Sequence, residues 1–299
     1  MIELMVGLLG AIFGSFAGAQ VWRIRARQLI EDKASGEEID QAELMRLKPL
    51  VGKLKHDRSQ CLSCGHLLAW YDLIPVASWL STAGKCRYCR SAIGRFEIIM
   101  ELGLAAFFVA SYLVFRPGLD APLELVQFVA WLAAGTVMSI LLAYDAKWFL
   151  LPERLNILLA AIALLYAAST FAIIGFSIEG LASLTGSLAI MSGLYLVIFV
   201  ISKGEWIGFG DVVLGVGLGL LLMRWDQAYL ALFLANVIAL IVIAPGFIRG
   251  SLTRKSHIPF GPFLILASII TVLWGERIAT ETMNALSGLT SSFFYTLML

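Results

Sequence analysis

The sequence predicts an all-α polytopic membrane protein with about eight transmembrane helices and one small domain outside the bilayer. Three observations lead to this fold class. The 299 residues are 60% hydrophobic and only 14% charged, with a mean hydropathy of +0.86, which differs strongly from the composition of soluble domains. Apolar runs of about 20 residues, the length that crosses a bilayer, recur along the chain. A single long polar interval separates the first run from the others.

The apolar runs define the predicted transmembrane helices in order. We therefore divide the chain into a first transmembrane helix (residues 1–22), a polar domain (23–95), a seven-helix membrane domain (96–277) and a C-terminal tail (278–299). The sixth helix is expected to be short. The eight runs begin near Ile2, Glu97, Leu123, Glu153, Ser177, Asp211, Gln227 and Phe260.

Basic residues orient these helices, because short cytoplasmic loops are enriched in lysine and arginine. Residues 22–95 hold thirteen of the 22 basic residues. If this interval is cytoplasmic and the helices alternate, only Arg116, Arg224 and Arg277 fall on the outer side. The prediction is an external N-terminus. The first run carries the acidic Glu3 at its start and is followed by arginines, which favours a retained anchor over a cleaved secretory signal.

All four cysteines lie in the polar interval as two C-x-x-C pairs. Cys61 and Cys64 form the first pair, Cys86 and Cys89 form the second, and twenty-one residues separate the pairs. Four thiolates from two tight turns can meet at one tetrahedral metal ion, and zinc is the expected occupant in a reducing cytosol. Such a site leaves no position for substrate, so its predicted role is structural. Thiol pairs without metal and a rubredoxin-like iron site remain alternatives.

Two aspartates are predicted to lie at the same depth of the membrane. Asp145 ends the third apolar run at the cytoplasmic side, and Asp211 begins the sixth at that side. An ionised carboxylate in hydrocarbon is costly and usually faces a cavity or a partner. Two carboxylates that share a site hold one proton between them, as in an aspartic protease. The pair is therefore predicted to be catalytic. Taken singly, Asp211 could be a helix N-cap and Asp145 a solvated loop residue.

Glycines surround the second aspartate in the segment IGFGDVVLGVGLGL. Gly208 and Gly210 are expected to support the catalytic motif by allowing close backbone approach and unusual dihedral angles. Gly215 and Gly219 form a small-xxx-small pattern, which is typical of tightly packed membrane helices. Helix packing alone is the alternative interpretation of these glycines.

The motifs together resemble those of the type IV prepilin leader peptidases, and the resemblance covers most of the chain. The segment at residues 58–102 is similar to the cytoplasmic zinc-binding segment of that family, including YDLIP, SWL and G-x-C between the cysteine pairs. DAKWFLLPERL, which begins at Asp145, resembles the first catalytic element of the family, and GFGDVVL resembles the second. GSF at residues 14–16 and IPFGPFL at residues 258–264 complete the set in the order of the family.

The resemblance implies an aspartic protease of the bacterial inner membrane that removes the basic leader of type IV pilin or pseudopilin precursors at the cytoplasmic face. It implies Asp145 and Asp211 as the catalytic pair and the four cysteines as metal ligands. In relatives with the cysteine segment, the same enzyme N-methylates the new amino terminus with S-adenosylmethionine. Zinc and this methyl donor are therefore the expected cofactors. The expected partners are prepilins or pseudopilins and membrane lipid, with no nucleic acid.

Two positions depart from the pattern of the family. Gly18 stands where the family usually has asparagine, and Val213 replaces a lysine that commonly follows the second aspartate. The first departure bears mainly on methylation, because its motif lies beside the cysteine domain. The second leaves both carboxylates in place.

Three other classes of protein could carry such acids. A presenilin or signal-peptide-peptidase type of intramembrane protease also pairs Tyr-Asp, here Tyr144 and Asp145, with a GxGD motif, but the cysteine segment and IPFGP argue against it. A proton-coupled transporter would place its acids near the bilayer midplane. A structural component of a secretion apparatus would leave both acids unexplained.

Overall fold

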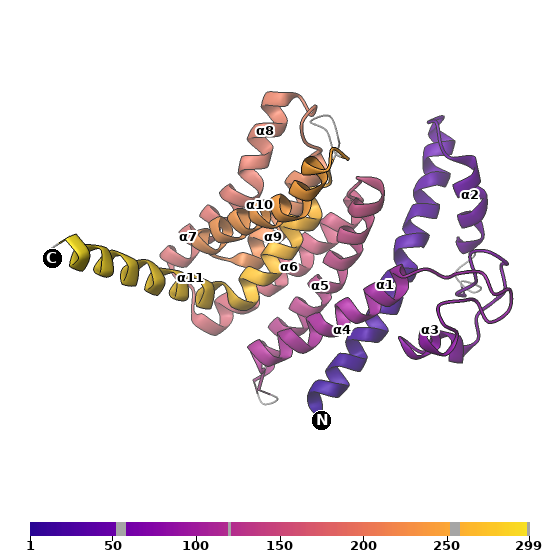
Figure 1. Cartoon of the computed structure of the whole chain (residues 1–299), viewed down its shortest axis with the longest axis horizontal. Coiled ribbons are helices and arrows are strands. Elements are labelled where there is room, and N and C mark those ends of the chain that lie inside the picture. Colours follow the sequence, from indigo (N-terminus) through magenta and orange to yellow (C-terminus); the bar gives the residue numbers. More distant parts are fainter. Residues whose placement is uncertain (52–57, 119–120, 252–257, 298–299) are drawn as a thin grey trace. The chain divides into compact units, whose positions relative to one another are not determined.

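The computed structural model describes residues 1–51, 58–118, 121–251 and 258–297. Within these ranges the chain is helical without strands, and isolated β-bridges occur only at the cysteine pairs. The predicted all-α architecture is confirmed. The long helices are α1 (Ile2–Ser35), α4 (Phe96–Phe115), α5 (Pro122–Trp148), α6 (Glu153–Ile174), α7 (Ile178–Leu188), α8 (Leu194–Ser202), α9 (Phe209–Leu222), α10 (Trp225–Ile248) and α11 (Gly261–Leu297) (Figure 1).

In the described part of the chain, seven helical segments are long and apolar enough to cross a membrane. One of them, Ile178–Ser202, joins α7 to α8 through a π-helical turn at Ala189–Gly193. α9 is apolar but has only 14 residues, which agrees with the short sixth helix expected from the sequence. All eight apolar segments begin within two residues of their predicted positions. Among the basic residues used for the predicted topology, Lys53, Lys55, Arg254 and Lys255 lie outside the described residues.

α1 continues beyond the membrane-spanning part expected at residues 1–22. It ends only at Gly36, which has φ 82° and closes the helix in a left-handed conformation. α2 (Gln41–Leu47) folds back onto the polar half of α1. Apolar side chains of both helices and of the 3-10 turn Lys48–Leu50 then form a small core, because the apolar positions of α1 continue at helical spacing past the membrane segment. The buried members of this core are Ala26, Leu29, Leu44, Leu47 and Leu50.

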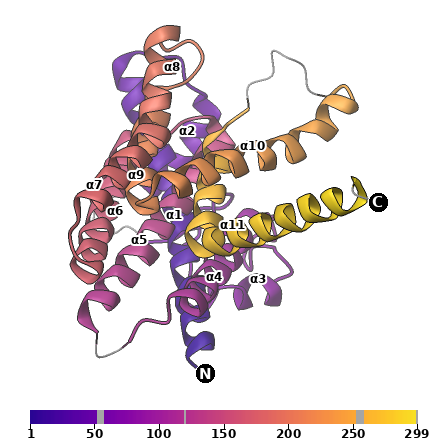
Figure 2. The same ribbon diagram turned by 90° about the vertical axis from the view of Figure 1, so that its left-hand side faces the viewer.

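Glycines bring α1 and α4 into close backbone contact, and both views show the two helices crossing (Figures 1 and 2). A Cβ atom at Gly14 would lie 2.5 Å from the Cα atom of Glu101, and one at Gly10 would lie 2.6 Å from the carbonyl oxygen of Leu104. No side chain fits at either position without moving the backbone. The glycine of the GSF motif therefore has a packing role.

The chain divides into two compact units, and α5 contributes to both. The first unit comprises Met1–Gly118 and Leu132–Lys147, and the second comprises Leu119–Trp131 and Trp148–Leu299. In the second unit, α9 packs against α6, α7, the π-helical turn and α11. A Cβ atom at Gly215 would overlap the backbone of Met191, and one at Gly219 would lie 3.1 Å from Cδ2 of Leu188. This confirms the predicted packing role of the small residues in α9.

Candidate active site and metal centre

The four cysteines come together in the first unit. Their sulfur atoms all lie within 4.8 Å of one another, and the Sγ atoms of Cys61 and Cys89 are 3.9 Å apart. Cys86 is buried, whereas Cys64 and Cys89 are exposed. The cluster could therefore hold a metal ion, as the spacing of the two pairs predicts.

Each cysteine pair lies in a turn of the same backbone geometry. The N–H group of the first cysteine donates to the carbonyl oxygen five residues later, at 3.0 Å for Cys61 and 2.8 Å for Cys86. The residue after the second cysteine has a positive φ in both turns, 70° at Gly65 and 60° at Arg90. Glycine adopts this conformation without steric cost, and arginine does not. The second turn thus keeps the shape of the first despite a less suitable residue.

Ser91 favours the metal-binding form of a neighbouring thiol. Its hydroxyl oxygen lies 3.0 Å from Sγ of Cys89. Hydrogen bonds with the hydroxyl and the backbone N–H of Ser91 lower the pKa of the Cys89 thiol to about 6. The thiolate is the form that binds metal ions, so this cysteine is available as a ligand at neutral pH.

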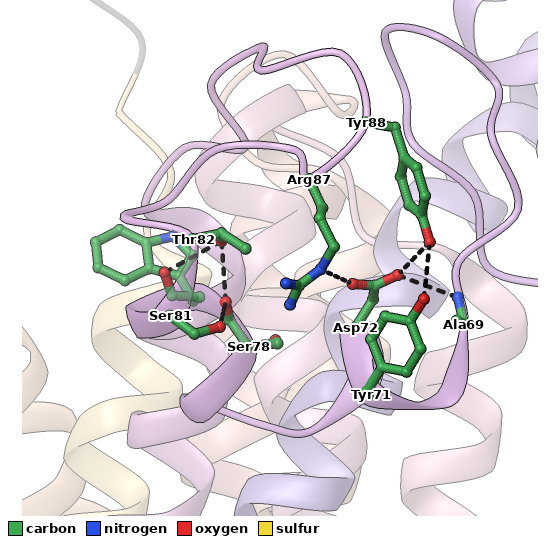
Figure 3. Close-up of polar contacts among 9 residues, drawn as sticks. Ala69, Tyr71, Asp72, Ser78, Ser81, Thr82, Arg87 and Tyr88 are labelled. Carbon is green, nitrogen blue, oxygen red and sulfur yellow. Dashed lines mark hydrogen bonds and ion pairs between the residues drawn. The ribbon is translucent and has the colours of Figure 1, made fainter.

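Asp72 of the YDLIP segment links the residues between the two cysteine pairs to the turn that holds Cys86 and Cys89. Its carboxylate accepts hydrogen bonds from Nε of Arg87 at 2.9 Å, from the hydroxyl of Tyr88 at 3.0 Å and from the N–H of Ala69 at 3.2 Å (Figure 3). Desolvation opposes ionisation of this group, but the three hydrogen bonds hold the pKa of Asp72 below its usual range. The YDLIP segment between the cysteine pairs therefore contacts the turn that holds Cys86 and Cys89.

Glu101 ties the cysteine segment to α4. The residue is only 7% exposed, and its carboxylate accepts a hydrogen bond from the N–H of Val76 at 2.7 Å. Val76 has φ 60° and ψ −49°, which is rare for a β-branched residue, and it directly precedes α3 (Ala77–Ser81). The buried carboxylate stabilises this strained turn. Glu101 is not among the predicted functional residues, although an acid inside an apolar run is a recognisable signal.

Asp145 lies in the last turn of α5, in the first unit, and is only 5% exposed. Tyr144 before it is also buried. Lys147 after it places its ammonium group 4.0 Å and 3.9 Å from the ring centroids of Trp22 and Phe96. The alternative of a solvated loop position for Asp145 is therefore wrong, because the residue is helical and buried.

Asp211 lies in the first turn of α9, in the second unit, and Gly208 is the N-cap of that helix. The N-cap alternative for Asp211 is therefore wrong. Gly208 has φ −79° and ψ 153°, and Gly210 is helical, so the expected unusual dihedral angles are also wrong. The expected close approach is confirmed at Gly210, where a Cβ atom would lie 2.9 Å from Cβ of Leu151.

Asn156 adds a second contact between the segment that follows Asp145 and the GFGDVVL segment. It is fully buried on α6, and its Nδ2 atom donates to the carbonyl oxygen of Gly210 at 3.0 Å. The LLPERLN segment that follows Asp145 in the chain thus holds the turn that precedes Asp211. Sequence reasoning missed this residue, although an amide four residues after Pro152 in an apolar helix was a possible signal. The pairing of Asp145 with Asp211, which belong to different units, stays a prediction.

Comparison with known families decides the class of this protein. Residues 8–115 match the Bacterial Peptidase A24 N-terminal domain, and residues 125–244 match the Type IV leader peptidase family. A protein of Burkholderia pseudomallei named prepilin leader peptidase/N-methyltransferase is 30% identical over 275 residues, which cover 90% of this chain and 84% of the relative. The chain belongs to the type IV leader peptidase family.

Two other relatives carry the same name, and each aligns with this chain over nearly the full length of both proteins. The protein of Dichelobacter nodosus is 29% identical, over 91% of this chain and 92% of its own. That of Pseudomonas aeruginosa is also 29% identical, over 91% and 90%. No solved structure matches the chain. The resemblance read from the motifs is confirmed, and none of these matches favours the presenilin, transporter or structural-component alternatives.

Proposed function

We propose that this protein cleaves the leader from type IV prepilins or pseudopilins at the cytoplasmic face of the bacterial inner membrane and then N-methylates the new amino terminus. The observation that carries the proposal is the similarity to relatives named prepilin leader peptidase/N-methyltransferase over about nine tenths of both chains. Their name couples the two activities. The apolar helices and the cysteine cluster support the same conclusion.

The peptidase activity is assigned to the carboxylates of Asp145 and Asp211. One carboxylate, ionised, takes a proton from water, which attacks the scissile carbonyl carbon. The other, protonated, donates a hydrogen bond to the carbonyl oxygen and stabilises the charge that develops there. A proton then passes to the leaving amine as the peptide bond breaks. Like charges cannot both ionise at short distance, so a paired site supplies one acid and one base at the same pH.

The predicted depth of the aspartates suits the proposed substrate. A prepilin has a basic leader followed by an apolar helix, so its cleavage point lies at the cytoplasmic membrane surface. Asp145 is at the end of α5 and Asp211 at the start of α9, the helix ends that the distribution of basic residues places in the cytoplasm. A peptide bond at that surface is reached without burial of the charged leader.

Zinc is the proposed metal of the cysteine cluster. Tetrahedral zinc with thiolate distances of about 2.3 Å requires sulfur atoms about 3.8 Å apart, and the Cys61 and Cys89 sulfurs are 3.9 Å apart. Four thiolate ligands leave no open position for substrate or water. The cysteines would therefore order the segment and take no part in bond cleavage.

The proposed function is tested with the purified full-length protein in detergent and several prepilins. We expect mass spectrometry to show precursor shortening without S-adenosylmethionine, and a further gain of one methyl group when it is added. If the precursors all remain intact, the peptidase assignment is wrong. If cleavage occurs but no product gains a methyl group, only the second activity is lost from the proposal.

Asn156 is proposed as a positioning residue for the second aspartate. Asn156→Leu removes the hydrogen bond to Gly210, so the turn before Asp211 loses one of its fixed points. We expect kcat to fall roughly tenfold or more with little change in KM, because small displacements of a catalytic group slow the chemical step more than binding. Steady-state cleavage of a prepilin measures both constants.

A matched control removes a comparable hydrogen bond elsewhere in the same unit. Gln127 of α5 donates from Nε2 to the hydroxyl of Thr170 at 2.7 Å. Gln127→Leu therefore deletes one amide hydrogen bond between membrane helices, away from both motifs, and kcat should stay near that of the wild type. Equal losses of kcat in Asn156→Leu and Gln127→Leu would reduce the role of Asn156 to general stability.

A further inference from the structure

The first unit contains a cavity that the proposed peptidase mechanism does not use. Its volume is about 490 Å³, within the range of roughly 300–1,000 Å³ that is usual for small-molecule sites. The walls come from α1, α2, the beginning of α4, the end of α5 and the cysteine segment. The lining side chains that carry the argument are Trp22, Arg23, Arg46, Phe96, Glu97 and Lys147.

Glu97 provides an acceptor that lacks a donor. One carboxylate oxygen, Oε1, accepts a hydrogen bond from Nε1 of Trp22 at 3.3 Å. The other, Oε2, is buried and has no hydrogen-bond partner in the part of the chain that the structure describes. Leaving a buried acceptor unsatisfied is costly, and such atoms usually mark a missing water, ion or ligand. A cationic group bound in the cavity would satisfy this oxygen.

Trp22 and Phe96 give the cavity an aromatic wall. Their rings meet edge to face, with centroids 5.6 Å apart and planes at 76°. The Lys147 ammonium already lies about 4 Å from both centroids, so this wall tolerates a positive charge close to it. The apolar area of the rings also suits stacking with a planar base.

Guanidinium groups supply the opposite charge. Arg23 and Arg46 line the same cavity, and the guanidinium carbon of Arg46 lies 5.8 Å from the centroid of the Trp22 ring. Arginine recognises carboxylates through paired hydrogen bonds. The cavity therefore combines a carboxylate, guanidinium groups and aromatic rings. These groups are partners for an ammonium, for a carboxylate and for a planar base.

We propose that this cavity binds S-adenosylmethionine, with Glu97 as the acceptor for the cationic methionyl end. The inference rests on the proposed methyltransferase activity and assigns the donor site that this activity requires. The bound donor supplies a methyl group on sulfur. The unprotonated amino terminus of the processed pilin forms the new N–C bond as the C–S bond breaks, and the electron pair remains on the sulfur of S-adenosylhomocysteine. The product ammonium releases one proton to water.

Direct binding tests the role of Glu97. Equilibrium dialysis of radiolabelled S-adenosylmethionine against the full-length protein in detergent should show saturable binding that S-adenosylhomocysteine displaces. Glu97→Gln keeps the size of the side chain and removes its charge, so its Kd should rise roughly tenfold or more, as expected for loss of a charged hydrogen bond. Glu38→Gln, an exposed residue outside the cavity, is the matched control and should bind as the wild type does.

Photo-cross-linking locates the site without any substitution. Ultraviolet irradiation of the wild-type complex with methyl-labelled S-adenosylmethionine, followed by proteolysis and peptide mapping, should place the label in the peptides that contain Trp22 or Phe96. Label confined to the second unit would overturn the proposal. This readout also decides the matter if Glu97→Gln does not fold.

The outcomes separate this inference from the function on which it rests. If the wild type cleaves and methylates but Glu97→Gln binds the donor with unchanged Kd, the proposed site is wrong and the proposed function stands. If the wild type cleaves a prepilin but neither binds the donor nor methylates the product, the methyltransferase activity and its site are both rejected. Cleavage of the leader remains a separate result in either case.

Discussion

Replacement of either Asp145 or Asp211 by asparagine is expected to abolish leader cleavage, with a loss of at least roughly 10²–10⁴-fold in kcat. The amide has the size of the carboxylate but can neither take a proton from water nor complete a pair that shares one. Because the two groups act as a unit, the double variant should lose little more than either single variant. Product masses from a prepilin, recorded over time with equal amounts of folded protein, measure the effect.

The control for this pair is Asp32→Asn in the polar half of α1. It makes the same chemical change outside both catalytic elements, so cleavage should continue at the rate of the wild type. Substantial cleavage by Asp145→Asn or Asp211→Asn would show that the carboxylate removed in that variant is not part of the catalytic pair. The family assignment would survive that result, since it depends on similarity over most of the chain.

Cys86→Ser is expected to remove the bound metal and the order of the cysteine segment. Structural zinc contributes apparent binding free energies of about 10–16 kcal/mol in small metal-dependent domains, and there most of this energy is folding energy. Cys86 is the most buried of the four cysteines, at 3% exposed, so the substitution also buries a hydroxyl group in place of the thiol. The expected effect exceeds that of ordinary substitutions, which cost about 0.5–3 kcal/mol.

Two measurements check this prediction. Elemental analysis of the purified wild type should give zinc bound to the protein, and Cys86→Ser should have lost it. Limited proteolysis should then cut the variant between residues 58 and 95 much faster than the wild type. Ser63 lies between Cys61 and Cys64, but its side chain is exposed. The control variant Ser63→Ala should therefore retain the metal. Iron in the wild type would favour the rubredoxin-like alternative, and full zinc content in Cys86→Ser would refute a four-cysteine site.

The membrane helices and the cysteine cluster were predictable from sequence because each depends on local patterns. Apolar length predicts a spanning helix, and two C-x-x-C pairs bring thiols together wherever the chain folds between them. The extension of α1 to Ser35 was missed for a related reason. The apolar stripe that contacts α2 is narrow, and the many charged residues around it hide the helical period.

Contacts between distant segments could not be predicted from one sequence. Asn156 meets the carbonyl of Gly210, 54 residues away, and Glu101 meets the N–H of Val76 across the start of α4. Neither contact leaves a periodic signal. The departure at Gly18 shows the same limit, since only the structure reveals that this residue lines the cavity assigned to the methyl donor.

The close packing of α1 and α4 has a consequence for the chain between them. Trp22 and the start of α4 are held together by a ring contact to Phe96 and a hydrogen bond to Glu97, so the packed helices themselves hold the ends of this long loop. The entropy of loop closure grows slowly with length, by only about 0.6 kcal/mol for each doubling. A metal bound by the four cysteines would therefore order the interior of the loop, and its ends would not depend on it. An insertion in the connection between α1 and α2, at residues 36–40, should thus cost the fold little.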